Sequence, residues 1–233
     1  MSDFADKLVR EPRGGAPRRL RTRQALLDAG LKLMANQPID AIAIDEIVRA
    51  AGVAKGSFFN HFRDKDQFAD AVASQVRTEI EQAIGALNRD VEDPAQCVAR
   101  AVCLYILCAV RDPRRASVLL RSSSRLSRTA APLNRGVLAD VSRGLMSGRF
   151  AVPTVDAGVL MVLGVAQIAL ARVLDEPNKT VGAALGQQLC ALLLRGLGLN
   201  GAEAETIAAR AAHEVIEGTA PSVALLAISA SRS

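Results

Sequence analysis

The amino-acid sequence predicts an all-α protein, and three observations carry this prediction. Half of the 233 residues are apolar but only seven are aromatic, with no tryptophan, which favours packed aliphatic helices over an aromatic-rich β-sandwich. Apolar residues recur at helical spacings along most of the chain. No long segment alternates apolar and polar residues. The predicted helices span residues 22–36, 44–51, 54–60, 64–87, 94–111, 113–121, 133–147, 154–175, 180–197 and 202–217.

The N-terminal segment is strongly basic. Residues 1–23 contain seven basic and three acidic residues, so most of the net charge of +5 lies there. We expect residues 1–20 to form a flexible basic arm, which suits nucleic-acid phosphates because binding releases their counterions. A solvated tail without a partner is the alternative. No apolar stretch follows these charges as it would in a secretory signal.

Three short helices are predicted after this arm. Leucines at helical spacings indicate the first, over 22–36, which ends before Pro38. The second, over 44–51, has two acidic residues in its first turn, where they meet the positive end of the helix dipole, and Gly52 just after its last. The third, over 54–60, follows almost at once. Two short helices joined by a glycine-containing turn form a helix-turn-helix pattern.

The later helices are marked by caps and breaks. Asp64, with Gln67 three residues later, has the spacing of a capping box at the start of a long helix. Proline and serine clusters separate the next three helices. The helices over 154–175 and 180–197 are strongly apolar, whereas the last is amphipathic. The structure of the tail over 218–233 is left open.

The apolar segment 157–171 resembles part of a membrane span. It has fifteen uncharged residues, whereas a span needs about 20. A helix buried on most sides is therefore the better interpretation, and no membrane partner is expected. The four cysteines lack a metal-binding or C-x-x-C spacing and lie among apolar residues. We interpret them as reduced core thiols of a cytoplasmic protein.

The segment 47–68 carries residues suited to nucleic acid. Lys55 places an ammonium at the start of the third helix, Gly56 allows backbone to approach another molecule closely, and Ser57 offers a hydroxyl to a base edge or a phosphate. Lys65, in the first turn of the next helix, can bring a second cation and backbone N–H groups to a phosphate. An ordinary surface charge is the alternative for Lys65.

Aromatic residues support the same segment. Phe58 and Phe62, four residues apart, are predicted to face inward. Phe59, Asn60 and His61 then point outward, toward a DNA groove. Packing of His61 against the first helix is the alternative.

Together these residues resemble the DNA-binding domain of the TetR family of bacterial transcriptional regulators. The matching positions are Thr22, Arg23, Ile47, Gly52, Val53, Lys55, Gly56, Ser57, Phe59, Asn60, His61, Phe62 and Lys65. The resemblance implies a helix-turn-helix domain over 21–68 that binds double-stranded operator DNA. The DNA-binding residues expected on this basis are Arg19, Arg21, Thr22, Ala54, Lys55, Gly56, Ser57, Phe59, Asn60, His61 and Lys65.

Three positions depart from the family pattern. Ala43 stands where a threonine usually caps the second helix, so one hydroxyl contact to phosphate should be missing. Phe59 replaces the usual tyrosine and cannot donate a hydrogen bond. Val48 occupies a position that is often alanine. These departures shift the expected affinity toward Lys55, Lys65 and the basic arm.

The resemblance also implies a larger helical domain, over 69–217, for ligand binding and dimerisation. The helices over 154–175 and 180–197 are the dimerisation candidates, because helices that are apolar nearly all round need a partner; burial within one subunit is the alternative. Small residues expected to allow close approach there are Gly158, Gly164, Ala166, Ala169 and Gly186. The candidate ligand-binding residues are Cys97, Tyr105, Cys108, Arg121, Met161 and Gln167.

The predicted function is that of a homodimeric DNA-binding regulator, a repressor released from its operator by a small molecule. A DNA-binding dimer that needs no ligand, or that answers to a protein partner, is the alternative. An enzyme is not expected, since the chain has two histidines and no nucleophile–base arrangement, dinucleotide fingerprint or metal-ligand spacing. No cofactor or metal is therefore predicted.

Overall fold

The computed structural model describes residues 15–122 and 134–218, and these parts of the chain are helical, without a β-strand. The helices are α1 (Gly15–Met34), α2 (Ile44–Ala50), α3 (Lys55–Phe59), α4 (Lys65–Leu87), α5 (Pro94–Arg111), α6 (Pro113–Arg121), α7 (Arg135–Met146), α8 (Val155–Asp175), α9 (Lys179–Gly196) and α10 (Gly201–Ala211). A 3₁₀ turn, η1 (Ile39–Ala41), precedes α2, and a π-helical turn, η4 (Ala212–Ile216), follows α10. The all-α prediction is confirmed.

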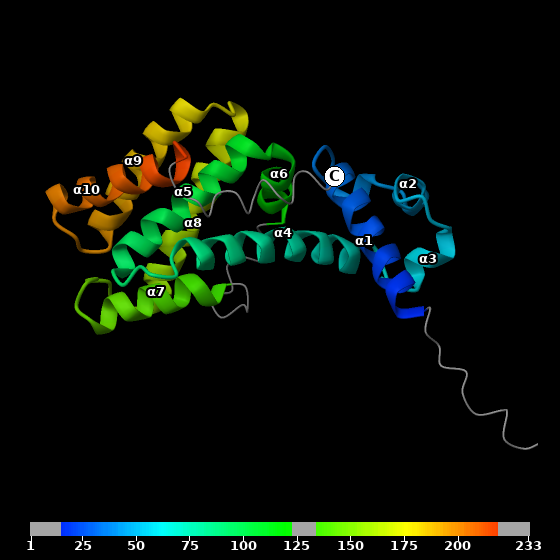
Figure 1. Ribbon diagram of the computed structural model, residues 1–233, viewed down its shortest axis with the longest axis horizontal. Helices are drawn as coiled ribbons and strands as arrows, with labels where there is room; N and C mark the ends of the chain where they lie inside the picture. The colour runs from blue at the N-terminus through cyan, green and yellow to red at the C-terminus, as the bar shows by residue number, and fades with distance from the viewer. Residues whose placement is uncertain (1–14, 123–133, 219–233) are drawn as a thin grey trace, which may run out of the picture.

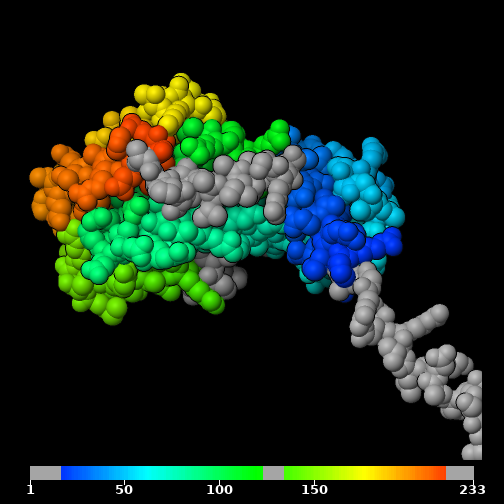
Figure 2. All heavy atoms as spheres, in the orientation of Figure 1, coloured from blue at the N-terminus to red at the C-terminus, as the bar shows by residue number. Residues whose placement is uncertain are grey.

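The helices form a small head and a larger bundle. Figure 1 shows α1, α2 and α3 at one end of the molecule, α5 to α10 at the other, and the long α4 running from the head along the bundle. The space-filling view in Figure 2 shows the head, in blue, packed directly against the rest of the molecule. Since α4 contacts α1 in the head and both α5 and α6 in the bundle, it links the two parts.

The first helix begins earlier than expected. Gly15 is already helical, so residues 15–20, which the charge pattern assigned to a flexible arm, belong to α1. Arginine, alanine and leucine are all good helix formers, and the charged side chains of Arg18 and Arg19 stay in solvent, so nothing opposes this extension. The remainder of the expected arm, 1–14, and the tail 219–233 lie outside the described residues.

Phenylalanine rings form the centre of the head. Phe58, Phe62 and Phe68 are buried, with ring centroids 5.1 to 5.6 Å apart. The inward orientation predicted for Phe58 and Phe62 is therefore confirmed. Gly52 has a φ of 66° in the turn after α2, a conformation that glycine adopts without steric cost. This turn sets the angle between α2 and α3.

The predicted cap of α4 is present. The Asp64 side chain accepts a hydrogen bond from the Gln67 backbone N–H at 2.8 Å. The Gln67 side chain in turn accepts one from the backbone N–H of Arg63 at 2.6 Å, one residue earlier than in the usual capping box. The cap fixes where the long helix begins, directly after the recognition segment.

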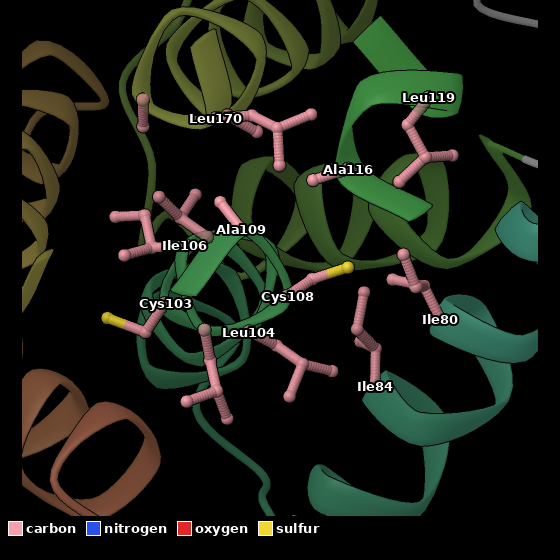
Figure 3. Packing of buried hydrophobic residues seen from close by; sticks show 14 of the residues in the cluster. Ile80, Ile84, Cys103, Leu104, Ile106, Cys108, Ala109, Ala116, Leu119 and Leu170 are labelled. Atoms are coloured by element: carbon pink, nitrogen blue, oxygen red, sulfur yellow. The ribbon is translucent and has the colours of Figure 1, made fainter. Parts of the chain in front are cut away.

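Helix α5 is the centre of the bundle. It packs against α4, α6, α7, α8, α9 and α10, and Figure 3 shows its aliphatic residues between those of α4, α6 and α8. All four cysteines are buried, as predicted for core thiols. Cys108 points toward Ile80 of α4 and Leu119 of α6, whereas Cys103 points to the opposite side of α5 (Figure 3), where its Sγ lies 3.8 Å from that of Cys190.

Helices α5 and α8 are each long and apolar enough to cross a membrane, judged by length and composition alone. Core helices of proteins outside membranes pass the same test. The length of α8 therefore does not support the expectation that its fifteen uncharged residues are too few for a span. In this fold α8 packs against α5, α7 and α9, so one side of the helix is buried inside the bundle.

The small residues of α8 and α9 act mostly inside the subunit, which differs from the expectation that they line a dimer interface. A Cβ at Gly158 would lie 2.7 Å from Val141 of α7, and one at Gly186 would lie 2.8 Å from Ile216. Ala169 is fully buried. Gly164 is the exception, since its surroundings are open. At Gly158, Gly186 and Ala169, the small side chain allows close packing against other parts of the same chain.

Candidate nucleic-acid interface and internal cavity

Helix α3 presents a polar surface at the outside of the head. Phe58 is anchored in the ring cluster, so the rest of this short helix turns away from the core. The exposed positions are Ala54, Lys55, Gly56, Phe59 and Asn60, and Ser57 is half-buried. A Cβ at Gly56 would meet nothing within 4 Å, so the backbone there is open to another molecule. These predicted residues therefore share one accessible surface.

Lys55 has an intramolecular partner. Its Nζ lies 2.9 Å from a carboxylate oxygen of Asp45 in the first turn of α2, and both side chains are exposed. Exposed ion pairs contribute little, about 0 to 1 kcal/mol. Another anion can therefore displace Asp45 at small cost.

Lys65 is placed differently from the prediction. Its Nζ donates hydrogen bonds of 3.0 to 3.2 Å to the backbone carbonyl oxygens of Ile39, Asp40 and Ile42. An ammonium has three N–H donors, and all three are directed at the η1 turn. Lys65 thus joins this turn to the start of α4 and has no donor left for a phosphate.

His61 lies against α1. It is half-buried, and burial, followed by the charges of Arg19 and Arg23, lowers its pKa. A neutral imidazole offers one donor and one acceptor rather than a cation. The alternative in which His61 packs near the first helix is therefore the better description, although Arg19 and Arg21 themselves stay exposed beside it.

The N-terminus of α2 lacks a side-chain cap, as expected from Ala43. Ala43 is its N-cap residue and makes no side-chain hydrogen bond. Thr22, the other hydroxyl expected near DNA, lies half-buried on α1. The departure from the family pattern at Ala43 therefore leaves α2 without a side-chain cap.

The bundle contains two small hollows between α4, α5, α6, α7 and α8, which share lining residues and which we treat together as the two ends of one candidate cavity. Aliphatic side chains form most of its wall, and Tyr105 and Ala166 border both of its ends. One end is lined by Glu81 and Asp140 and has a volume of about 30 Å³. The other is lined by Arg77 and Gln167 and has a volume of about 20 Å³. Each end holds about one or two water molecules.

Only two of the six expected ligand-binding residues line this cavity, namely Tyr105 and Gln167. Cys97 lies near Arg143, whose guanidinium is 3.5 Å from its Sγ. Cys108 fills the contact of α5 with α4 and α6 (Figure 3). Met161 lies close to Gly196 of α9. Arg121 borders a separate hollow next to η1 and the start of α4. The prediction was wrong for these four residues because helix periodicity shows which residues are buried but does not show which of them face a cavity.

Three cavity residues were not anticipated: Arg77, Glu81 and Asp140. A signal for the first two is present in the sequence, because they stand four apart on α4 among the buried positions Val76, Ile80 and Ile84. Charged groups in an apolar stripe are rarely buried without a partner. Asp140 lies on α7, and its place at the cavity depends on how α7 packs.

Polar groups in the cavity interact with one another. The Tyr105 hydroxyl donates to Glu81 Oε1 at 3.2 Å, and burial raises the pKa of both Tyr105 and Glu81. Burial also raises the pKa of Asp140, against the effect of Arg143 at 2.8 Å. Arg77 donates through Nη2 to the Asn134 side chain. The cavity therefore contains both signs of charge in an apolar surrounding.

Helix α4 connects the cavity with the head. Its middle carries Arg77 and Glu81, whereas its first turns carry Phe68 of the ring cluster. Arg115 of α6, which is buried, pairs with Glu79 of α4 and with Asp112. Helix α4 thus contributes residues both to the cavity and to the packing of the head.

An apolar strip runs along the outside of α8 and α9. Leu160 and Ile168 on α8 are 42% and 68% exposed, and Leu192 on α9 is 62% exposed. Gly164 lies between the two α8 residues along the helix and is exposed. Leu160, Gly164 and Ile168 follow at intervals of four and so share one face of α8, and exposed apolar residues grouped on one face mark an interaction site more often than single scattered residues do.

Comparisons with known proteins agree with this geometry. Residues 26–72 match the family described as bacterial regulatory proteins, tetR family. Residues 93–210 match the tetracyclin repressor-like C-terminal domain. The two matches correspond to the head with the start of α4, and to most of the bundle.

Curated relatives share part of the chain. The transcriptional regulator AcuR of Cereibacter sphaeroides is 34% identical over 76 residues, which are 31% of this chain and 35% of AcuR. The transcriptional regulator AcrR of Shigella flexneri is 32% identical over 91 residues, 37% of this chain and 40% of AcrR. The matched parts thus span well under two thirds of these relatives.

Solved structures share the whole fold. The RolR structure in complex with resorcinol is 25% identical, with a TM-score of 0.60, and the match covers 84% of this chain and 97% of that one. A tetR-family transcription regulator from Shewanella sp. PV-4 is 22% identical, with a TM-score of 0.69, over 77% of this chain and 99% of that one.

Proposed function

The chain belongs to the TetR family of DNA-binding transcriptional regulators, which is not a family of enzymes, and from this premise we propose that it is a homodimeric repressor released from its operator by a small molecule. The observation that carries the proposal is the exposed polar surface of α3 on a head held rigid by buried phenylalanines. Its relative DhaR of Mycobacterium sp. is described as a transcriptional repressor. We expect it to act in the cytoplasm, where operator DNA is found.

Helix α3 would enter the major groove. Ser57, Phe59 and Asn60 would contact base edges, and Ala54 and Gly56 would let the backbone approach closely. Lys55 and the arginines of α1 would bind phosphates. Two heads related by two-fold symmetry would read half-sites about 34 Å apart, or a multiple of this distance.

Dimerisation would use the apolar strip on α8 and α9. Two helices from each subunit would form a four-helix contact that covers Leu160, Ile168 and Leu192. A two-fold contact needs a surface that complements itself, and an aliphatic strip with a glycine in the middle meets this need without charges to match. The exposed side of α8 is then covered by a second copy of the chain.

A ligand in the cavity would control DNA binding through α4. RolR was solved with resorcinol, which suggests that this cavity also accepts a compact molecule. The ligand can shift the equilibrium only by binding one arrangement of the two heads more tightly than the other. A dimer that binds DNA without a ligand is the alternative, and it predicts that no small molecule weakens operator binding.

Gel-shift titration of the full chain with the DNA upstream of its own gene tests the proposal. Binding to this DNA is expected at nanomolar protein, with at least 1,000-fold preference over scrambled DNA of equal length. A folded dimer that shows no preference at low salt would contradict the regulator function.

The two lysines of the recognition segment are expected to behave differently. Lys55→Ala should weaken operator binding and lower the slope of log K against log salt by about one, because one phosphate contact is lost. Lys65→Met should leave that slope unchanged but lower the free energy of unfolding by about 2 kcal/mol, since three carbonyls lose a charged donor. Anisotropy titrations at several salt concentrations and urea unfolding measure the two quantities. Equal salt slopes for both variants would show that the lysines have been assigned incorrectly.

A further inference from the structure

Two buried hydrogen-bond donors at the same end of the cavity have no partner. These are Nε of Arg77 and Nε2 of Gln167. Arg77 is only 9% exposed, and its one hydrogen bond, to Asn134, is made by Nη2. Leaving a buried donor unpaired costs about 1 to 3 kcal/mol. A molecule with an oxygen acceptor at this place would remove that cost for both side chains.

The other end of the cavity offers acceptors. Glu81 receives the Tyr105 hydroxyl on Oε1, and both Glu81 and Asp140 line this end. A ligand hydroxyl can donate to a carboxylate here. The two ends therefore differ in the polar group that they favour.

The mixture of charges argues against a charged ligand. An anion would be attracted by Arg77 but repelled by Glu81 and Asp140, and a cation would meet the opposite pattern. In a low-dielectric cavity such repulsions are strong. An uncharged ligand avoids both and still makes the hydrogen bonds.

The remaining wall favours an apolar body. Apolar residues of α4, α5 and α8 line the cavity, namely Ile84, Val98, Val102, Leu163 and Leu170. Its volume, about 30 Å³ at one end and 20 Å³ at the other, is too small for a ring compound, since a cavity that takes up benzene is about 150 Å³. Binding must therefore separate the walls, one of which is α4.

We propose that the effector of this chain is an uncharged hydroxyl compound with an apolar body, of the phenol class. Its oxygen accepts hydrogen bonds from the unpaired donors of Arg77 and Gln167. This inference rests on the proposed function and specifies its ligand. The widening that the ligand needs moves α4 relative to α5 and α8, and so moves the head.

Calorimetric titration of the full chain without DNA tests the ligand class. The probes are phenol, benzoate, benzylammonium and toluene, which share one ring and differ in polar group. Phenol is expected to bind at least tenfold more tightly than each of the other three. Equal or tighter binding of benzoate, benzylammonium or toluene overturns the inference, and so does the absence of phenol binding by a folded chain.

Substitution at the unpaired donors locates the site. Gln167→Leu, which keeps the size of the side chain, should weaken phenol binding about tenfold and strengthen toluene binding. Gln187→Leu, on an exposed position of α9 turned away from Leu192, is the matched control and should change neither affinity. Arg77→Met should act like Gln167→Leu if a thermal melt shows that it folds. Unchanged phenol affinity in Gln167→Leu overturns the assignment.

The effect of phenol on operator binding is measured separately from the binding of phenol itself. If phenol binds as described but leaves operator affinity unchanged, the ligand inference holds and ligand-controlled repression fails. If operator binding is normal and phenol does not bind, the regulator function holds and the ligand class is wrong.

Discussion

Ile168→Arg is expected to convert the proposed dimer into a monomer and to weaken operator binding by about 100-fold or more. Ile168 is the most exposed apolar residue of α8, and a two-fold contact would bring the two new arginines close together without a partner. Burial of an unpaired charge is strongly unfavourable. A monomer binds each half-site separately and loses the gain of about 10² to 10⁴ that two linked heads provide.

Sedimentation and operator titration measure these two effects. Met146→Arg is the matched control, because Met146 is 80% exposed and belongs to α7, which contributes no residue to the strip on α8 and α9. It should remain dimeric with normal affinity. A dimer of undiminished stability in Ile168→Arg would place the interface elsewhere on the molecule.

Gly30→Ala is expected to destabilise the head by about 1 to 3 kcal/mol. The new Cβ would lie 2.4 Å from Cζ of Phe68 and 2.7 Å from Cγ2 of Val72, both on α4. These side chains are buried, and Phe68 is held between the rings of Phe58 and Phe62, so neither can move aside. The helix α1 must then move away from α4, and operator affinity should fall with it.

The sign of this effect distinguishes packing from helix propensity. Alanine is normally about 1 kcal/mol better than glycine inside a helix. Gly85→Ala in α4, where a Cβ would meet nothing within 4 Å, should therefore stabilise the chain. Urea unfolding monitored by circular dichroism gives both values. If Gly30→Ala were as stabilising as Gly85→Ala, the close contact between α1 and α4 would not exist.

Local patterns predicted the helices and the head well. The cap at Asp64, the turn at Gly52 and the inward rings of Phe58 and Phe62 depend on residues close together in the sequence, and the structure confirms all of them. The start of α1 was missed because a cluster of arginines has the same charge in an arm and in a helix. Charge shows affinity for phosphate but does not show backbone conformation.

Residues that act across helices were predicted less well. Lys65 finds its carbonyl partners more than twenty residues earlier in the chain. Glu81 and Asp140 come from α4 and α7 and meet at one cavity. Cys97, Cys108 and Met161 are close in the sequence to residues that line the cavity, but they do not line it themselves.

The sequence by itself determined the helical class, the helix-turn-helix head and the residues that α3 exposes, because helix periodicity, caps and glycine turns act over a few neighbouring residues. The tertiary structure decided which polar groups share a cavity, which glycines serve packing within the subunit, and that Lys65 holds a turn. These properties depend on the angles and rotations at which helices pack, and many distant side chains set those together.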